Sequence, residues 1–175
     1  MPKKSYDLVI RGGRVIDPAL GFGREASIFI KDGKIVKMEK TSEGSRDLKG
    51  MPEEKVIDAA GMIVTPGLID VHVHLREPGR EDEETVETGC RAAAAGGFTS
   101  LCCMPNTAPA IDNQETVKFV QDRAQSADAR VYVVGAITKG RKGAELSEIG
   151  DLVKVGAVAV SDDGRSVWAV ERGSS

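Results

Sequence analysis

Short apolar runs and turn-forming residues alternate through the first 60 residues of the chain. The alternating segment 26–30 and the apolar segment 35–38 flank Asp32-Gly33, a dipeptide typical of tight hairpin turns. We therefore expect a β-hairpin over residues 28–38. Further short strands are expected at 6–10, 14–18 and 55–59. The pattern predicts a small β-rich segment over residues 1–61.

From residue 62 onward, apolar strand-like segments alternate with helix-like segments. Strands are expected at 68–74, 99–104, 130–136 and 157–160, and helices at 83–95, 113–124 and 144–155. The strands are too apolar to face water on either side, which indicates a parallel sheet covered by helices. This α/β pattern over 62–164 corresponds to about half of a (β/α)8 barrel, which typically needs ~250 residues. A four-stranded, doubly wound sheet is the alternative.

Composition and charge exclude several classes of protein. Hydrophobic residues make up 41% of the 175 residues, and the net charge is −3. This excludes a chain disordered throughout, and no basic stripe points to nucleic acid. No apolar run approaches the ~18 residues of a membrane span, and the start lacks the apolar block of a signal peptide, so we expect a cytoplasmic protein without a membrane partner. Cys90, Cys102 and Cys103 lie in apolar segments and favour reduced, buried thiols.

The sequence contains two histidines, His72 and His74, which end an apolar strand-like segment. Side chains at positions i and i+2 of a strand lie on the same face, so both imidazoles would point to one place. Neutral imidazoles bind zinc well, and in a parallel barrel the carboxyl ends of the strands carry the active site. A hydrogen-bonded or solvent-exposed pair is the alternative, but this position favours half of a zinc site.

Other polar residues follow the predicted strands at the same edge of the sheet. Asp163 follows the fourth strand within Ser161-Asp162-Asp163-Gly164. It could be a third metal ligand, a bridge between two metal ions or a residue of a simple turn. Arg76 follows the histidines and Asn106 follows the second strand; together they could clamp a substrate carboxylate and an amide. Taken singly, Arg76 is typical of a surface ion pair and Asn106 of a turn. The basic segment 139–143 lacks the order of a phosphate-binding loop and is expected to be a solvated loop.

Several of these segments carry a family resemblance. Residues 66–79, Pro-Gly-Leu-Ile-Asp-Val-His-Val-His-Leu-Arg-Glu-Pro-Gly, resemble the first-strand signature of dihydroorotases in the amidohydrolase superfamily. Gly96-Gly97-Phe98-Thr99, Met104-Pro105-Asn106-Thr107 and the segments 139–143 and 161–164 strengthen the resemblance. It extends from about residue 5 to Gly164 and is greatest to the bacterial class I enzymes.

The resemblance implies a TIM-like metal-dependent hydrolase barrel preceded by a composite β-sandwich segment. It implies reversible conversion of N-carbamoyl-L-aspartate and dihydroorotate, in pyrimidine biosynthesis, with one or two Zn2+ ions. His72, His74 and Asp163 would bind metal, while Arg76 and Asn106 would hold the carboxylate of this small-molecule substrate. A homo-oligomer and an association with aspartate carbamoyltransferase are the partners implied.

The chain departs from the family pattern in one respect. Family members are more than twice as long and take further metal-binding histidines and a catalytic aspartate from later strands. No histidine follows His74, so the resemblance assigns no catalytic residue here and predicts little turnover by this chain alone. Residues 165–175 form a divergent tail, as a frameshift, an early stop or a truncated gene model would produce. Unpaired strand edges would make such a partial barrel marginally stable or oligomeric.

Two other functions compete with this one. Allantoinases, hydantoinases and dihydropyrimidinases share the superfamily, but their motif contexts differ from His-Leu-Arg-Glu-Pro-Gly. The second alternative is a non-catalytic dihydroorotase-like subunit that scaffolds aspartate carbamoyltransferase. Such proteins usually lose the histidines that this chain keeps.

Overall fold

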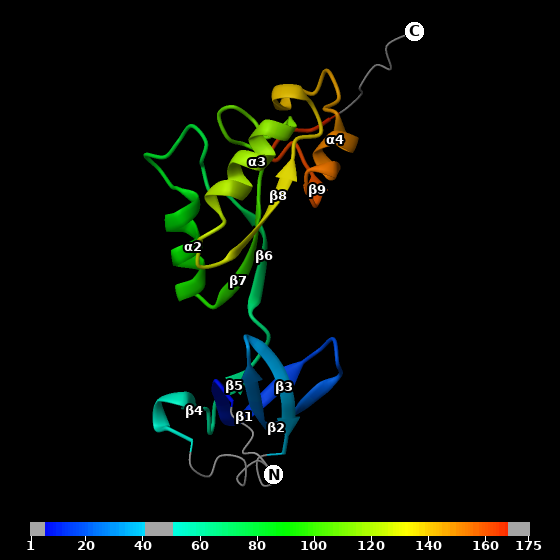
Figure 1. The fold of residues 1–175 in the computed structure, drawn as a ribbon. Coiled ribbons are helices and arrows are strands. Elements are labelled where there is room, and N and C mark those ends of the chain that lie inside the picture. Colours follow the sequence, from blue (N-terminus) through cyan, green and yellow to red (C-terminus); the bar gives the residue numbers. More distant parts are fainter. Residues whose placement is uncertain (1–5, 41–50, 168–175) are drawn as a thin grey trace. The chain divides into compact units, whose positions relative to one another are not determined.

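The computed structural model of the chain describes residues 6–40 and 51–167 (Figure 1). The chain divides into two compact units, Met1–Pro66 and Gly67–Ser175. Each unit is described by itself below. Most of the tail expected at 165–175 lies outside the described residues.

The first unit is a β-sheet in which β2 pairs with both β1 and β3 in the antiparallel sense. Two short strands, β4 and β5, pair with β1 in the parallel sense. The predicted hairpin is confirmed, because Asp32 and Gly33 connect β2 to β3 and both have positive φ, 49° and 69°. The elements are β1 (Leu8–Asp17), β2 (Phe22–Lys31), β3 (Lys34–Glu39), a 3-10 turn (Glu53–Lys55), β4 (Val56–Asp58) and β5 (Ile63–Val64).

One prediction for this unit is wrong. The sequence predicted two strands, 6–10 and 14–18, separated by Gly12-Gly13, whereas the structure has one continuous strand, β1. The pairing with β2 shifts between Ile10 and Gly13, and Gly12 has a φ of 73°. Glycine adopts this conformation without steric cost, so the chain forms a β-bulge where the sequence suggested a turn.

The second unit is a four-stranded parallel sheet with the strand order β6-β7-β8-β9. Helices connect successive strands, so the predicted β/α alternation is confirmed. The elements are β6 (Leu68–Val73), α2 (Val86–Ala95), β7 (Phe98–Cys103), α3 (Gln114–Arg123), β8 (Arg130–Gly135), a 3-10 turn (Lys139–Arg141), α4 (Ile149–Lys154) and β9 (Ala159–Val160).

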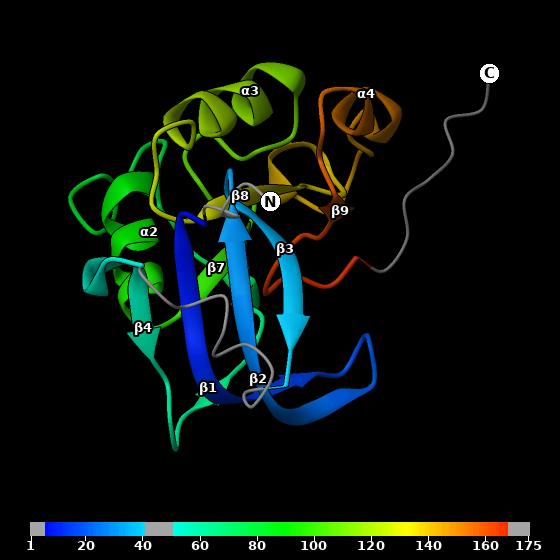
Figure 2. The same ribbon diagram turned by 60° about the horizontal axis from the view of Figure 1, so that its bottom comes forward.

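The strand order and the placement of the helices favour a partial barrel over a doubly wound sheet. The strands follow one another in sequence order, without the reversal of a doubly wound fold. The helices α2, α3 and α4 lie along one face of the curved sheet (Figure 2). One apolar cluster joins them to the strands, with Val86 from α2, Val117 from α3 and Leu152 from α4. This confirms the predicted first half of a (β/α)8 barrel.

The helix predicted at 144–155 begins later, at Ile149. Leu146 forms an isolated antiparallel bridge with Thr138, and the Ser147 N–H donates to the Ile137 carbonyl. These contacts hold the preceding residues in extended conformation. Leu146 is 45% exposed instead of lying on an apolar helix face.

Apolar side chains of β6 are exposed at an edge of this sheet. Ile69 and Val71 are 62% and 69% exposed, and among the described residues β6 pairs only with β7. Exposed apolar strand edges promote association, so self-association of the chain stays a prediction. Size-exclusion chromatography over a range of protein concentrations measures it, and a monomer at every concentration would contradict it.

Cys90 and Cys103 are buried free thiols, as predicted, whereas Cys102 is only partly buried. Burial raises the pKa of Cys103 from 9.0 to about 11. Fewer than about 1% of such thiols are ionised at pH 8, and only the thiolate reacts. We expect iodoacetamide to modify Cys103 at least ~100-fold more slowly in the folded chain than in urea, as measured by peptide mass spectrometry.

The raised pKa of Cys103 also sets the direction of a pH effect on stability. The neutral thiol is favoured in the fold, so its contribution is complete below pH 9 and is lost as the pH rises through about 11. Equal labelling of Cys103 in folded and denatured protein at pH 8 would contradict both expectations.

Among the helices of the described residues, none has the length and apolar character to span a membrane.

Candidate metal centre

Three side chains with metal-binding atoms converge in the second unit. His72 lies in β6, His74 follows that strand, and Asp163 follows β9. One ligand atom from each lies within 4.8 Å of those of the other two. His72 Nε2 is 2.9 Å from Asp163 Oδ1, and His74 Nδ1 is 3.9 Å from Asp163 Oδ2. The structure therefore brings together the residues that the sequence assigned to metal binding.

The β6 backbone directs both imidazoles to this place. The two ring centroids are 5.2 Å apart, as expected for side chains on one face of a strand. The end of β6 is held by the Met104 N–H, which donates to the Val73 carbonyl at 2.9 Å. The His72 side chain is 56% exposed and the Asp163 side chain only 11% exposed, so the group opens to solvent on the His72 side.

The two aspartates after β9 have different surroundings. Asp162 is 2% exposed, and its carboxylate accepts hydrogen bonds from the Thr138 N–H and hydroxyl. Asp163 faces the histidines, and its own N–H donates to Ser161 Oγ at 3.0 Å. Asp163 also has a φ of 28°, so the turn and the candidate ligand coincide in one residue.

Asn106 joins this group, but Arg76 has another partner. Asn106 Oδ1 lies 2.9 Å from His74 Nδ1. In the tautomer with the proton on His74 Nδ1, this amide oxygen accepts from the ring and Nε2 keeps a free lone pair. Arg76 Nε lies 3.3 Å from Glu83 Oε2, and no hydrogen bond or ion pair connects Arg76 to Asn106 or the histidines. Binding of one substrate carboxylate does not require the two residues to touch, so this expected role of Arg76 and Asn106 stays a prediction.

The donor set of the three residues fits a metal ion. Two imidazole nitrogens and a carboxylate oxygen are the three-ligand set found in many catalytic zinc sites. In a tetrahedral site with ligand bonds of ~2.0–2.1 Å, two ligand atoms of one ion lie ~3.4 Å apart. The ligand atoms of His72, His74 and Asp163 lie within 4.8 Å of one another, so side-chain rotations would have to bring them closer around one ion. The group could hold a metal ion.

Glu77, which sequence analysis did not single out, anchors the segment that follows the histidines. This buried carboxylate accepts a hydrogen bond from the Val86 N–H at the start of α2 and lies 3.0 Å from Arg123 Nε of α3. It thus connects the segment after His74 to two helices. The Leu-Arg-Glu-Pro-Gly motif contained the signal, but no spacing rule reveals a partner 46 residues away in the chain.

A family model and several named proteins are similar to this chain in sequence. Residues 61–171 match the family model described as "Dihydro-orotase-like", and this match extends beyond Gly164, where the resemblance was expected to end. A dihydroorotase of Solibacter usitatus is 53% identical over 161 residues, or 91% of this chain and 36% of the relative. A dihydroorotase of Geobacter sulfurreducens is 49% identical over 166 residues, or 94% and 38%. The chain thus spans little more than a third of the length of these relatives.

Similar solved structures support the fold. The L-hydantoinase (dihydropyrimidinase) of Arthrobacter aurescens matches with a TM-score of 0.72 and 24% identity, over 89% of this chain and 32% of that protein. An N-acyl-D-glutamate deacylase of Bordetella bronchiseptica, solved with zinc and a phosphonate inhibitor, matches with a TM-score of 0.54 and 22% identity, over 75% and 30%.

Proposed function

Since the chain belongs to the dihydroorotase-like family, we propose that it carries the metal ligands and the substrate-carboxylate ligands of a zinc-dependent dihydroorotase. The reaction would be the reversible conversion of N-carbamoyl-L-aspartate and dihydroorotate. The convergence of His72, His74 and Asp163 is the observation that carries this proposal. The chain keeps all three metal-binding side chains, which favours an enzyme site over a non-catalytic scaffolding subunit.

The three residues would each supply a different part of the metal site. His72 and His74 would donate neutral nitrogens, and Asp163 would add a negative charge that offsets part of the charge of the ion. The contact with Asn106 would orient the His74 ring, and with the proton on Nδ1 it would leave Nε2 free for the ion. A zinc ion bound there would supply Lewis-acid activation of water and of an amide carbonyl.

Arg76 and Asn106 would bind the carboxylate of the substrate. The Asn106 oxygen is used by His74, but its NH2 group has no protein acceptor among the described residues and can donate to a carboxylate. Arg76 contacts Glu83 through Nε, which leaves its two outer nitrogens for a bidentate contact. A substrate that engages Nε as well would displace Glu83.

A comparison of two ligands tests the proposed substrate class. Dihydroorotate and dihydrouracil share a ring and differ in one carboxylate, so calorimetry on the zinc-loaded chain isolates the contribution of that group. A charge-assisted contact contributes about 1.5–3 kcal/mol, so we expect dihydroorotate to bind ~10–100-fold more tightly. The variant Arg76→Ala should remove this preference.

The control variant is Arg91→Ala, because Arg91 is exposed in α2 and pairs with Glu87, which is not a partner of Arg76. It should keep the preference for dihydroorotate. Equal affinity for the two rings, or tighter binding of dihydrouracil, would contradict the proposal and favour a dihydropyrimidinase-like or hydantoinase-like function. A cytoplasmic location and binding to aspartate carbamoyltransferase stay predictions from the resemblance.

A further inference from the structure

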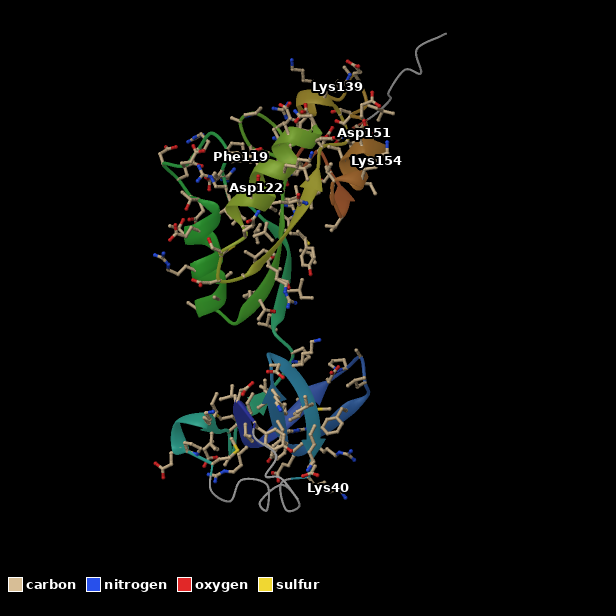
Figure 3. All side chains as sticks on the ribbon, in the orientation of Figure 1. Lys40, Phe119, Asp122, Lys139, Asp151 and Lys154 are labelled. Atoms are coloured by element: carbon tan, nitrogen blue, oxygen red, sulfur yellow. The ribbon has the colours of Figure 1, made fainter. Side chains whose placement is uncertain are left out.

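The basic segment 139–143 is mostly exposed, as the sequence predicted, but one of its side chains is partly buried. Its cations have two different environments. Lys139, labelled in Figure 3, is half exposed and pairs with Glu145. Arg141 instead reaches the residues after β9, where Nε and Nη2 both donate to the Asp162 carbonyl at 3.1 Å and Nη2 also donates to the Asp163 carbonyl. The expectation is therefore wrong for Arg141.

We infer that Arg141 is a positioning residue for Asp163, holding the backbone of this candidate metal ligand so that its carboxylate meets His72 and His74. The inference rests on the proposed metal centre. Arg141 does not contact the carboxylate itself, so its action would pass through the backbone on either side of Asp163.

A second set of contacts holds the residues after β9 through the side chain of Asp162. The fully buried Thr138 donates its N–H and hydroxyl to the Asp162 carboxylate. The Thr138 hydroxyl also accepts from the Gly143 N–H at 2.9 Å, which closes the loop between them. Thr138 thus holds the Asp162 side chain, and Arg141 holds the backbone carbonyls of Asp162 and Asp163. Together these contacts fix the backbone from which the Asp163 carboxylate reaches the histidines.

Asp163 benefits from such support because its backbone conformation is uncommon. Its φ of 28° lies in the left-handed region, which few residues other than glycine adopt, although aspartate does so more often than most. If the carbonyl contacts were lost, the backbone would relax and the carboxylate would move away from His72 Nε2, now 2.9 Å from it. The planar guanidinium contacts two successive carbonyls at once, a geometry that a lysine ammonium does not reproduce.

The zinc affinities of three single variants test the inference, each measured by competition with a chromophoric chelator. Removing a residue that orients a metal ligand typically weakens binding ~10–100-fold, so Arg141→Ala should raise the Kd at least ~10-fold. Arg141→Lys keeps the positive charge but lacks the planar guanidinium, so it should bind zinc nearly as weakly as Arg141→Ala. Lys139→Ala, in the same loop, should change the Kd less than ~2-fold. The Co2+-substituted chain should show a changed visible spectrum for both Arg141 variants.

A double variant separates positioning from a general effect on folding. If Arg141 acts through Asp163, then Asp163→Ala/Arg141→Ala should bind zinc as Asp163→Ala alone does. Additive losses, an unchanged Kd for Arg141→Ala or full rescue by Arg141→Lys would each overturn the inference. Zinc binding that survives loss of both histidines would instead overturn the proposed metal centre, so the two failures are distinguishable.

Discussion

Zinc affinity is expected to fall at least ~100-fold when His72 and His74 are both replaced by alanine. Four-ligand structural zinc sites bind with about 10–16 kcal/mol, so each ligand contributes roughly 3 kcal/mol. The double variant would keep only Asp163 of the three converging donors. A single carboxylate is a weak zinc ligand, and ordinary surface carboxylates would compete with it. Isothermal titration calorimetry with ZnCl2 on both proteins gives the comparison.

The matched control for this experiment is Cys102→Ser. The chain has free thiols, and Cys102 is the least buried of them, so a thiol is the alternative zinc donor. We expect Cys102→Ser to bind zinc with unchanged affinity. A His72→Ala/His74→Ala chain that binds as tightly as the unmodified chain would remove the metal centre, and with it the zinc-dependent function proposed above. Circular dichroism of the double variant checks that the fold is kept, as the exposed His72 side chain leads us to expect.

The metal group was predictable to the extent that its geometry is local. Strand periodicity alone places His72 and His74 on one face, because successive side chains alternate in any strand. The position of Asp163 required one further step, since parallel strands joined by helices bring their carboxyl ends to one edge. Both steps use backbone regularities that do not depend on particular side-chain contacts.

The features that sequence analysis missed depend on contacts that no sequence pattern shows. The role of Arg141 depends on carbonyls 21 and 22 residues away, and no pattern within 139–143 reveals them. The late start of α4 depends on the bridge between Leu146 and Thr138, which overrides helical spacing. The partner of Arg76 was not predicted either, since its guanidinium pairs with Glu83. Sequence patterns predict the positions of helices and strands well, but they predict the partners of individual side chains poorly.

A large loss of stability is expected from Gly79→Ala, in the Leu-Arg-Glu-Pro-Gly motif after the histidines. Gly79 has a φ of 100°, and a Cβ atom there would lie 2.0 Å from the Ala108 carbonyl oxygen. The Ala108 N–H donates to the Pro78 carbonyl at 3.0 Å, so the two loops are in direct backbone contact. A backbone atom cannot move aside as a flexible side chain does, and separating the loops would break this hydrogen bond.

Strain at positive φ costs about 1–2 kcal/mol, and a tight overlap costs about 1–3 kcal/mol more. We therefore expect Gly79→Ala to lower the free energy of unfolding by about 3 kcal/mol, measured by urea denaturation. Gly97→Ala is the matched control, because Gly97 also has a positive φ of 83° but nothing lies within 4 Å of an added Cβ. It should lose only about 1 kcal/mol.

The difference between these two variants measures the contact between the loops, since both carry the backbone strain. That contact joins the loop of Arg76 to the loop of Asn106, the two residues proposed to bind the substrate carboxylate. Gly79→Ala should therefore also weaken the preference for dihydroorotate over dihydrouracil, whereas Gly97→Ala should keep it. Equal destabilisation by the two substitutions would show that the loops separate without cost. The close approach at Gly79 would then have no part in shaping the site.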